Sequence, residues 1–297
     1  MDPWEPRDDE NPYAAGAEVA WPPPRPAERP RRRVVLPLVL FFATCYTTYR
    51  VGSAEYGPVG GLEYAAAVLL ILGAHELGHF FQTIRYRVSA SFPYFIPMPA
   101  GPFGTLGAVI GMRAHEGDRR ALFDIAITGP LAGLVPALIC CALGLRFSEI
   151  VVQGGIPRDE HVLGAPLLFR WLVEVIHGPL PAGSFIELHP IAFAGWVGLF
   201  ITALNLFPMS QLDGGHILYA LFRKFAHPVA VTILGLCVFA VVWFQLWHWT
   251  VMLVLVMMMG PDHPPTANDE VPLGWGRTVL GWLAILFVPF GFTPTPF

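Results

Sequence analysis

The feature that most constrains this chain is a series of apolar stretches that approach or exceed the length needed to cross a bilayer. A membrane-spanning helix needs about 20 largely apolar residues. The candidate stretches are 34–49, 59–84, 121–145, 190–207, 228–260 and 275–292. Charged residues make up only 13% of the chain, against roughly 25% in soluble domains. We therefore predict an all-α integral membrane protein with about six to eight transmembrane helices.

The distribution of basic residues predicts the topology. Fourteen of the 18 Lys and Arg residues lie in residues 1–33, in the loops 85–120 and 208–227, and at Arg277. Basic residues concentrate on the cytoplasmic side, so these segments and the N-terminus are expected there. Residues 1–33 are rich in proline and charge and predict a disordered cytoplasmic tail, followed by a membrane domain over 34–297. The short loops and the absence of a signal-peptide or transit-peptide pattern favour a prokaryotic inner membrane.

The remaining loops differ in character. Loop 146–189 carries more acids than arginines and is expected on the outer side, with an interfacial helix lying on the bilayer over 162–176. Segment 88–112 has no charged residue but many prolines and glycines, which forbid a regular helix. Its extended pieces, Pro93–Met98 and Thr105–Gly111, predict a re-entrant, hairpin-like loop. The net charge of −4 argues against nucleic acid as a partner, and the oligomeric state stays open.

A His-Glu-x-x-His motif ends the second apolar stretch. His75 and His79 are four residues apart, so they share a helix face and their rings can bind one ion. Glu76 is placed to act on a water molecule at the metal rather than to bind the metal itself. Ionisable groups in an apolar helix are costly and therefore functional by default. The alternative is a hydrogen-bonded polar cluster that joins helices.

A third ligand has to come from elsewhere, because catalytic zinc usually has three protein ligands. Asp213 is the candidate, since two glycines follow it and permit a close approach; it is also a candidate N-cap for a helix over 214–222. Asn205 either donates to a developing oxyanion or bonds a neighbouring helix. His216 is a candidate ligand or a donor behind the ligands, but a solvated position is favoured, as it is for His115.

These motifs together resemble the site-2 protease family, the intramembrane zinc metalloproteases of peptidase family M50. The resemblance rests on the His-Glu-x-x-His motif at 75–79 and on the Asn-x-x-Pro and Leu-Asp-Gly-Gly motifs within 205–215. Segment Phe123–Gly133 is similar to the Gly-Pro segment of the next family helix. The chain looks closest to the minimal branch that has no PDZ domain, in which a Pro-Asp-His-Pro-Pro segment like 261–265 recurs. For that segment a Pro-rich turn and active-site gating are the two interpretations.

The resemblance implies a zinc metalloendopeptidase with one Zn²⁺ per chain. His75, His79 and Asp213 would bind the ion, Glu76 would be the catalytic acid and base, and Asn205 would assist at the scissile carbonyl. The implied substrates are transmembrane proteins, cut in or near their spans after another protease has trimmed them.

The carbonyls of a substrate helix are hydrogen-bonded, so the helix must unwind before attack. We expect loop 88–112 to take the unwound segment as an added strand. A zinc hydrolase of another substrate, an ion or metal transporter and an inactive relative are the alternatives.

Overall fold

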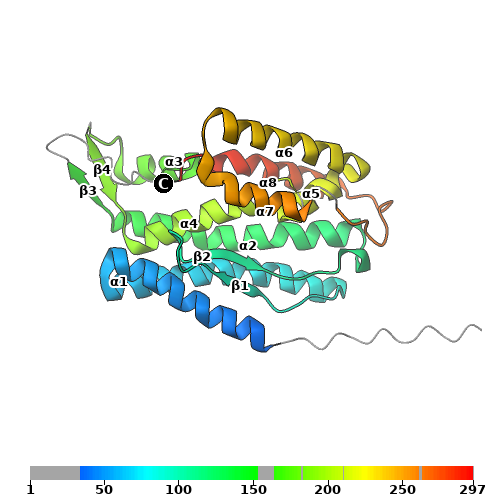
Figure 1. Cartoon of the computed structure of the whole chain (residues 1–297), viewed down its shortest axis with the longest axis horizontal. Helices are drawn as coiled ribbons and strands as arrows, with labels where there is room; N and C mark the ends of the chain where they lie inside the picture. Colours follow the sequence, from blue (N-terminus) through cyan, green and yellow to red (C-terminus); the bar gives the residue numbers. More distant parts are fainter. Residues whose placement is uncertain (1–33, 153–163, 182, 210, 261–262, 297) are drawn as a thin grey trace, which may run out of the picture. The chain divides into compact units, whose positions relative to one another are not determined.

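The computed structural model describes residues 34–152, 164–181, 183–209, 211–260 and 263–296. The predicted tail over 1–33 lies outside the described residues. The described part is mainly helical and holds two small antiparallel sheets (Figure 1).

The first two expected spans belong to one bent helix, α1 (Val35–Tyr86). Its bend is at Gly57, whose φ of 73° is left-handed, followed by Pro58. Glycine adopts this φ without steric cost, and proline suits the first turn of the following arm. The two arms then lie against each other (Figure 1), so closely that a Cβ on Gly52 would be 2.8 Å from Cβ of Tyr64. The two expected spans are therefore separate helical arms joined by a tight turn at Gly57 and Pro58.

A β-hairpin follows, as the prolines and glycines of 88–112 predict. Strand β1 (Tyr94–Pro97) pairs antiparallel with β2 (Thr105–Val109). The hairpin tip is attached to α1: the Thr47 hydroxyl donates to the Gly104 carbonyl at 2.6 Å, and the Tyr64 hydroxyl donates to the Phe103 carbonyl at 2.9 Å. These bonds fix the hairpin against the helix that carries the histidine motif. Its depth in a membrane stays a prediction.

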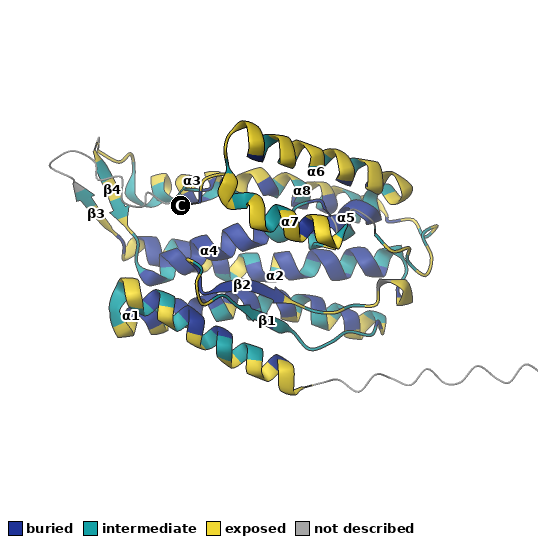
Figure 2. Ribbon diagram, viewed as in Figure 1, coloured by how far each residue is buried: buried dark blue, intermediate teal, exposed yellow. Residues whose placement is uncertain are grey.

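The core lies between α1, α2 (Arg119–Arg146) and α4 (Pro190–Asn205). Helix α2 starts where the Asp118 carboxylate accepts from the Ala121 N–H at 2.8 Å, which is an N-cap bond. Helix α4 is apolar on every side and is almost entirely buried (Figure 2), as such a helix must be. It forms the rigid centre against which the site-bearing elements pack.

The region between α2 and α4 holds a second sheet that the sequence pattern did not predict. Strands β3 (Glu149–Val152) and β4 (Ser184–Glu187) pair antiparallel. Helix α3 (Leu167–His177) lies within the expected outer loop and exposes Leu167, Trp171 and Val175, which are spaced four residues apart. One helix face is therefore apolar and exposed, as an interfacial helix requires. The earlier part of that prediction, 162–163, lies outside the described residues.

The C-terminal part resolves the ambiguity over 228–260 in favour of two helices. Its elements are α5 (Asp213–Phe222), η3 (Arg223–Phe225), α6 (Ala226–Trp243), η4 (Trp247–Trp249), α7 (Thr250–Met259) and α8 (Trp275–Gly291). The chain turns between α6 and α7 with Gln245 at a φ of 56°. Helices α6 and α7 are mostly exposed (Figure 2).

Within the described residues, three helical segments are long and apolar enough to cross a membrane: Val35–Tyr86, Arg119–Arg146 and Asp213–Trp243. Shorter apolar helices cover Pro190–Asn205, Trp247–Met259 and Trp275–Gly291. The chain thus has the apolar helices of a membrane protein, and the count of six to eight spans stays a prediction.

Candidate metal centre

The second arm of α1 presents both histidines and the glutamate of the motif. His75, Glu76 and His79 are 4%, 2% and 5% exposed, respectively. The Nε2 atoms of the two histidines lie 3.0 Å apart, as the four-residue spacing predicts for side chains on one helix face. Neither ring is a solvated surface group.

Helix α2 approaches these histidines through glycines. A Cβ on Gly129 would lie 2.0 Å from Nε2 of His79, and one on Gly133 would lie 3.0 Å from Cβ of His75. A side chain at position 129 would therefore overlap the ring itself. The similarity of segment 123–133 to the family helix thus has a steric reason: small residues let α2 cover the histidine face of α1.

A backbone carbonyl of α2 also fixes the orientation of one ring. Nδ1 of His79 lies 2.7 Å from the carbonyl oxygen of Ile125. A carbonyl only accepts, so Nδ1 carries the proton and Nε2 keeps its lone pair. This is the usual arrangement behind a metal-binding histidine.

Asp213, the first residue of α5, completes the group. Its Oδ2 lies 3.1 Å from Nε2 of His75, and its Oδ1 lies 3.3 Å from Nε2 of His79. Ligands of a tetrahedral zinc ion, each at about 2.0–2.1 Å, are roughly 3.3 Å from one another. His75, His79 and Asp213 are accordingly a group that could hold one metal ion.

The local structure explains how Asp213 reaches this position. A Cβ on Gly214 would lie 2.0 Å from the carbonyl oxygen of Leu206, so glycine is required where α5 meets the end of α4. Leu212, rather than Asp213, is the N-cap residue, and it makes no side-chain capping bond. The structure thus does not support the alternative of Asp213 as an N-cap, and its carboxylate faces the histidines instead.

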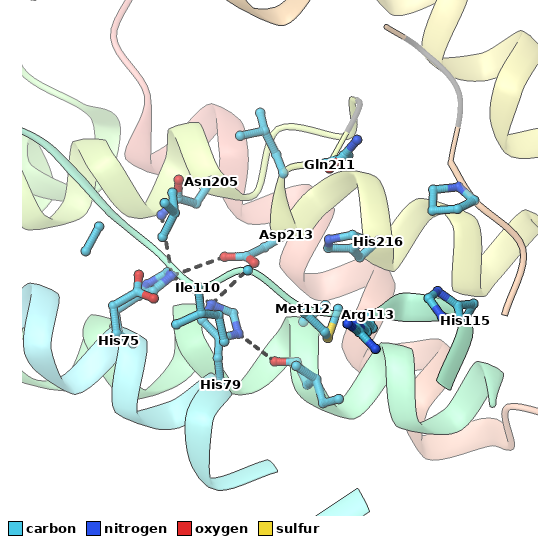
Figure 3. Close-up of a pocket in the computed structure, with 18 residues that line it drawn as sticks. His75, His79, Ile110, Met112, Arg113, His115, Asn205, Gln211, Asp213 and His216 are labelled. Carbon is cyan, nitrogen blue, oxygen red and sulfur yellow. Dashed lines mark hydrogen bonds and ion pairs between the residues drawn. The ribbon is translucent and has the colours of Figure 1, made fainter. Parts of the chain in front are cut away.

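Asn205 ends α4 beside the same group (Figure 3). Its Nδ2 lies 3.4 Å from Nε2 of His75. The amide thus lines the site rather than only joining two helices.

One cavity of about 350 Å³ is lined by His75, Glu76, His79, Asn205 and Asp213 (Figure 3). One wall is the backbone from Ala108 to Arg113, which continues β2; the opposite side holds Gln211, Asp213 and His216. His115 also lines the cavity and is exposed, as expected.

The donor set fits a divalent cation. Among the described residues that line the cavity, the carboxylates are Glu76 and Asp213, and Arg113 is the one Lys or Arg. Arg113 already pairs with Glu116 at 3.3 Å. A doubly charged ion would balance the two carboxylates, which burial otherwise makes costly.

Glu76 supplies an independent sign of chemistry. Within the described residues its Oε2 is buried and has no hydrogen-bond partner. Buried polar atoms are rarely left so, and an unsatisfied one calls for an explanation. Packing and hydrogen bonding within the described residues do not account for this carboxylate, which lines the cavity beside both histidines.

Sequence reasoning missed one element of the site. His216 is half-buried rather than solvated, and its Nδ1 lies 2.5 Å from Nε2 of His263. His263 belongs to the segment around 261–265, of which Pro261 and Asp262 lie outside the described residues. The proline-rich pattern marks that segment as irregular but gives no sign of which helix it contacts.

Comparison with known proteins places the chain in a family. The model of peptidase family M50 matches residues 63–247, which include the histidine motif, Asn205 and Asp213. The chain belongs to peptidase family M50.

Several curated relatives of this M50 chain come from plants. It is 30% identical over 241 residues to a protein named probable zinc metalloprotease EGY2, chloroplastic, of Arabidopsis thaliana, which covers 78% of this chain and 43% of the relative. It is also 30% identical over 242 residues to the protein of Arabidopsis thaliana named probable zinc metalloprotease EGY1, chloroplastic, with the same coverage of 78% and 43%.

Rice (Oryza sativa subsp. japonica) has a protein of the latter name that is 30% identical over 232 residues, 74% of this chain and 38% of the relative. The chain thus spans less than half the length of these relatives. No solved structure gives a significant match.

Family and geometry agree on the metal. The relatives are named for zinc, and imidazole nitrogens with one carboxylate are a common ligand set of catalytic zinc. Zinc is the cofactor that this M50 site indicates.

Proposed function

We propose that this chain is an intramembrane zinc metalloendopeptidase in which His75, His79 and Asp213 hold the ion. One observation carries the proposal: donor atoms from α1 and α5, which are 138 positions apart in sequence, converge to 3.1 Å. The proposed substrates are transmembrane proteins, cut in or near their spans after an earlier cut by another protease. The proposed location is a prokaryotic inner membrane, with the N-terminus in the cytoplasm.

The chain's own residues supply the proton transfers. Zinc, when bound, polarises the scissile carbonyl and makes water more acidic. The Glu76 carboxylate, which lines the cavity, takes the proton of the attacking water and returns it to the leaving amine. Asn205 donates its amide N–H to the carbonyl oxygen as negative charge develops there.

A substitution at Glu76 tests this assignment. Glu76→Gln removes the base but no ligand, so zinc content should be retained while cleavage falls at least about 10²-fold. The measurement is cleavage of a synthetic single-span peptide in phosphatidylcholine vesicles, with zinc content determined on the same preparations. Equal cleavage by wild type and variant would refute the proposal.

We propose further that the substrate enters as a strand beside β2. In the described residues β2 pairs only with β1, and the end of β2 together with the residues after it, Ala108–Met112, lines the cavity. The N–H groups of Gly111 and Arg113 bond toward the β1 side, to Ser91 Oγ and to the Ser89 carbonyl. Because strand residues alternate, the backbone groups of Ile110 face the other way, and a substrate strand can pair with them.

Ile110 permits a matched test of this strand addition. Ile110→Pro removes one of the N–H groups that face the substrate and leaves the bonds of Gly111 and Arg113 to the β1 side in place. Cleavage of the same peptide should fall at least about tenfold, with normal zinc content. Ile110→Ala keeps the N–H and is the control. Strand addition is excluded if the proline and alanine variants cleave equally.

A further inference from the structure

The segment from His263 to Pro272 is held between α5 and the start of α2. The Ala267 N–H donates to the Gly117 carbonyl at 2.8 Å, and the Arg119 N–H donates to the Asn268 carbonyl at 3.2 Å. On the other side, the Tyr219 hydroxyl donates to Oδ2 of Asp269 at 2.8 Å. We call residues 263–272 the strap.

The strap fixes the ring of His216. The His263 ring stacks on Tyr219, with centroids 4.2 Å apart, and its Nε2 lies 2.5 Å from Nδ1 of His216. Nδ1 of His263 lies 2.6 Å from the carbonyl oxygen of Pro264. Each ring is thereby held in one orientation.

This chain of bonds also assigns the tautomers of two neutral rings. The Pro264 carbonyl can only accept, so Nδ1 of His263 carries that ring's proton and its Nε2 accepts. The donor to this Nε2 must then be Nδ1 of His216. A neutral imidazole has one N–H, so Nε2 of His216 keeps a lone pair and no described partner uses it.

The position of His216 indicates which substrate group can reach this Nε2 acceptor. His216 lines the cavity one turn after Asp213, on the side opposite Ile110 (Figure 3). A substrate strand that pairs with β2 along one edge turns its other edge toward α5. That second edge alternates C=O and N–H groups. Asn205 offers a donor to a carbonyl there, and an N–H of the same edge needs an acceptor.

We propose that His216 is a substrate-binding residue whose Nε2 accepts a hydrogen bond from a backbone N–H beside the scissile bond. His263 is the positioning residue that keeps His216 in the required tautomer. This assignment rests on the proposed protease function and gives the histidine of the strap a role beyond that of a turn.

The test couples His216 to individual substrate N–H groups. The probe is the single-span peptide in phosphatidylcholine vesicles, made in versions that each replace one N–H flanking the cut by an ester oxygen. With the full-length wild type, one version should lose about 3- to 10-fold in kcat/KM. With His216→Asn, which keeps a donor for His263 but has no acceptor at the Nε2 position, that version and the parent peptide should be cleaved equally.

Conservative variants separate contact from general damage. His216→Gln places an amide oxygen near the Nε2 position and should restore part of the ester effect. His263→Gln keeps an acceptor for His216 and should preserve the effect, whereas His263→Leu should lose it, with zinc content normal in all four variants. Ester effects that are equal in wild type and His216→Asn overturn this proposal alone. Failure of wild type to cleave the parent peptide overturns the protease proposal with it.

Discussion

At the scale of single residues, the metal centre combines parts that sequence can and cannot reveal. The spacing of His75 and His79 requires them to share a helix face, so their convergence follows from the sequence. The carbonyl that orients His79 belongs to the backbone of Ile125. Every residue has such a carbonyl, so the sequence does not show which one contacts the ring. The approach of Asp213 depends on how α5 packs. The two glycines after it and the motif resemblance made it the candidate ligand, but neither fixes its distance from the histidines.

Gly129 gives a prediction at this scale. In Gly129→Ala the new Cβ would lie 2.0 Å from Nε2 of His79, so α2 or the ring must shift. Overpacking of this kind costs about 1–3 kcal/mol, and zinc affinity should fall about tenfold or more. Zinc competition with a chromogenic chelator measures it. Gly73→Ala in α1, where a Cβ meets nothing within 4 Å, is the control and should bind zinc like wild type.

At the scale of elements, local sequence patterns predicted the first hairpin, whereas strand pairing between distant segments was not predicted. The hairpin was predictable because prolines and glycines flank two short extended segments, which pair as β1 and β2. The pairing of β3 with β4 joins four-residue strands across a long stretch of chain, which leaves no local pattern. The break between α6 and α7 depends on a left-handed Gln245, a residue that does not mark turns.

The strap should respond to acid. Burial lowers the pKa of His263, although the Pro264 carbonyl and Asp269 act to raise it. Among the described residues, the charged and titratable groups around it are His216, Tyr219 and Asp269. A histidine whose folded pKa is lowered binds fewer protons folded than unfolded. The stability it contributes is present above about pH 6.5 and is lost as pH falls below that value.

Hydrogen exchange of residues 263–272 between pH 7.5 and 5.5 measures this response. After correction for intrinsic exchange rates, protection of the strap should decrease on acidification in wild type. The His263→Gln variant has no titratable group at position 263. Any pH dependence that remains in it measures the effect of the other histidines, including those of the metal centre. Protection that is independent of pH, or equally dependent in both proteins, would contradict the role given to His263.

At the scale of the whole molecule, the apolar stretches predicted a helical membrane protein, but not that the first two of them are joined by a turn as tight as the one at Gly57 and Pro58. The bend at Gly57 and Pro58 returns α1 beside itself, and α4 fills the centre, so α1 and α5 meet at the cavity. Their meeting brings the Glu76 and Asp213 carboxylates to the wall of one cavity, where a bound cation would reduce their mutual repulsion. The ion is thus expected to stabilise the fold as well as to serve catalysis.

Metal removal tests this coupling of site and fold. Zinc at about 1,000 times its Kd should stabilise wild type by roughly 4 kcal/mol, because it binds only the folded state. Thermal unfolding of the full chain in detergent, with zinc or with a chelator, measures the difference. Asp213→Ala should lose most of it, whereas Glu76→Gln should keep it and should melt higher than wild type in chelator, since it removes one buried, uncompensated charge. A zinc-dependent shift of equal size in wild type and Asp213→Ala would show that the ion binds elsewhere.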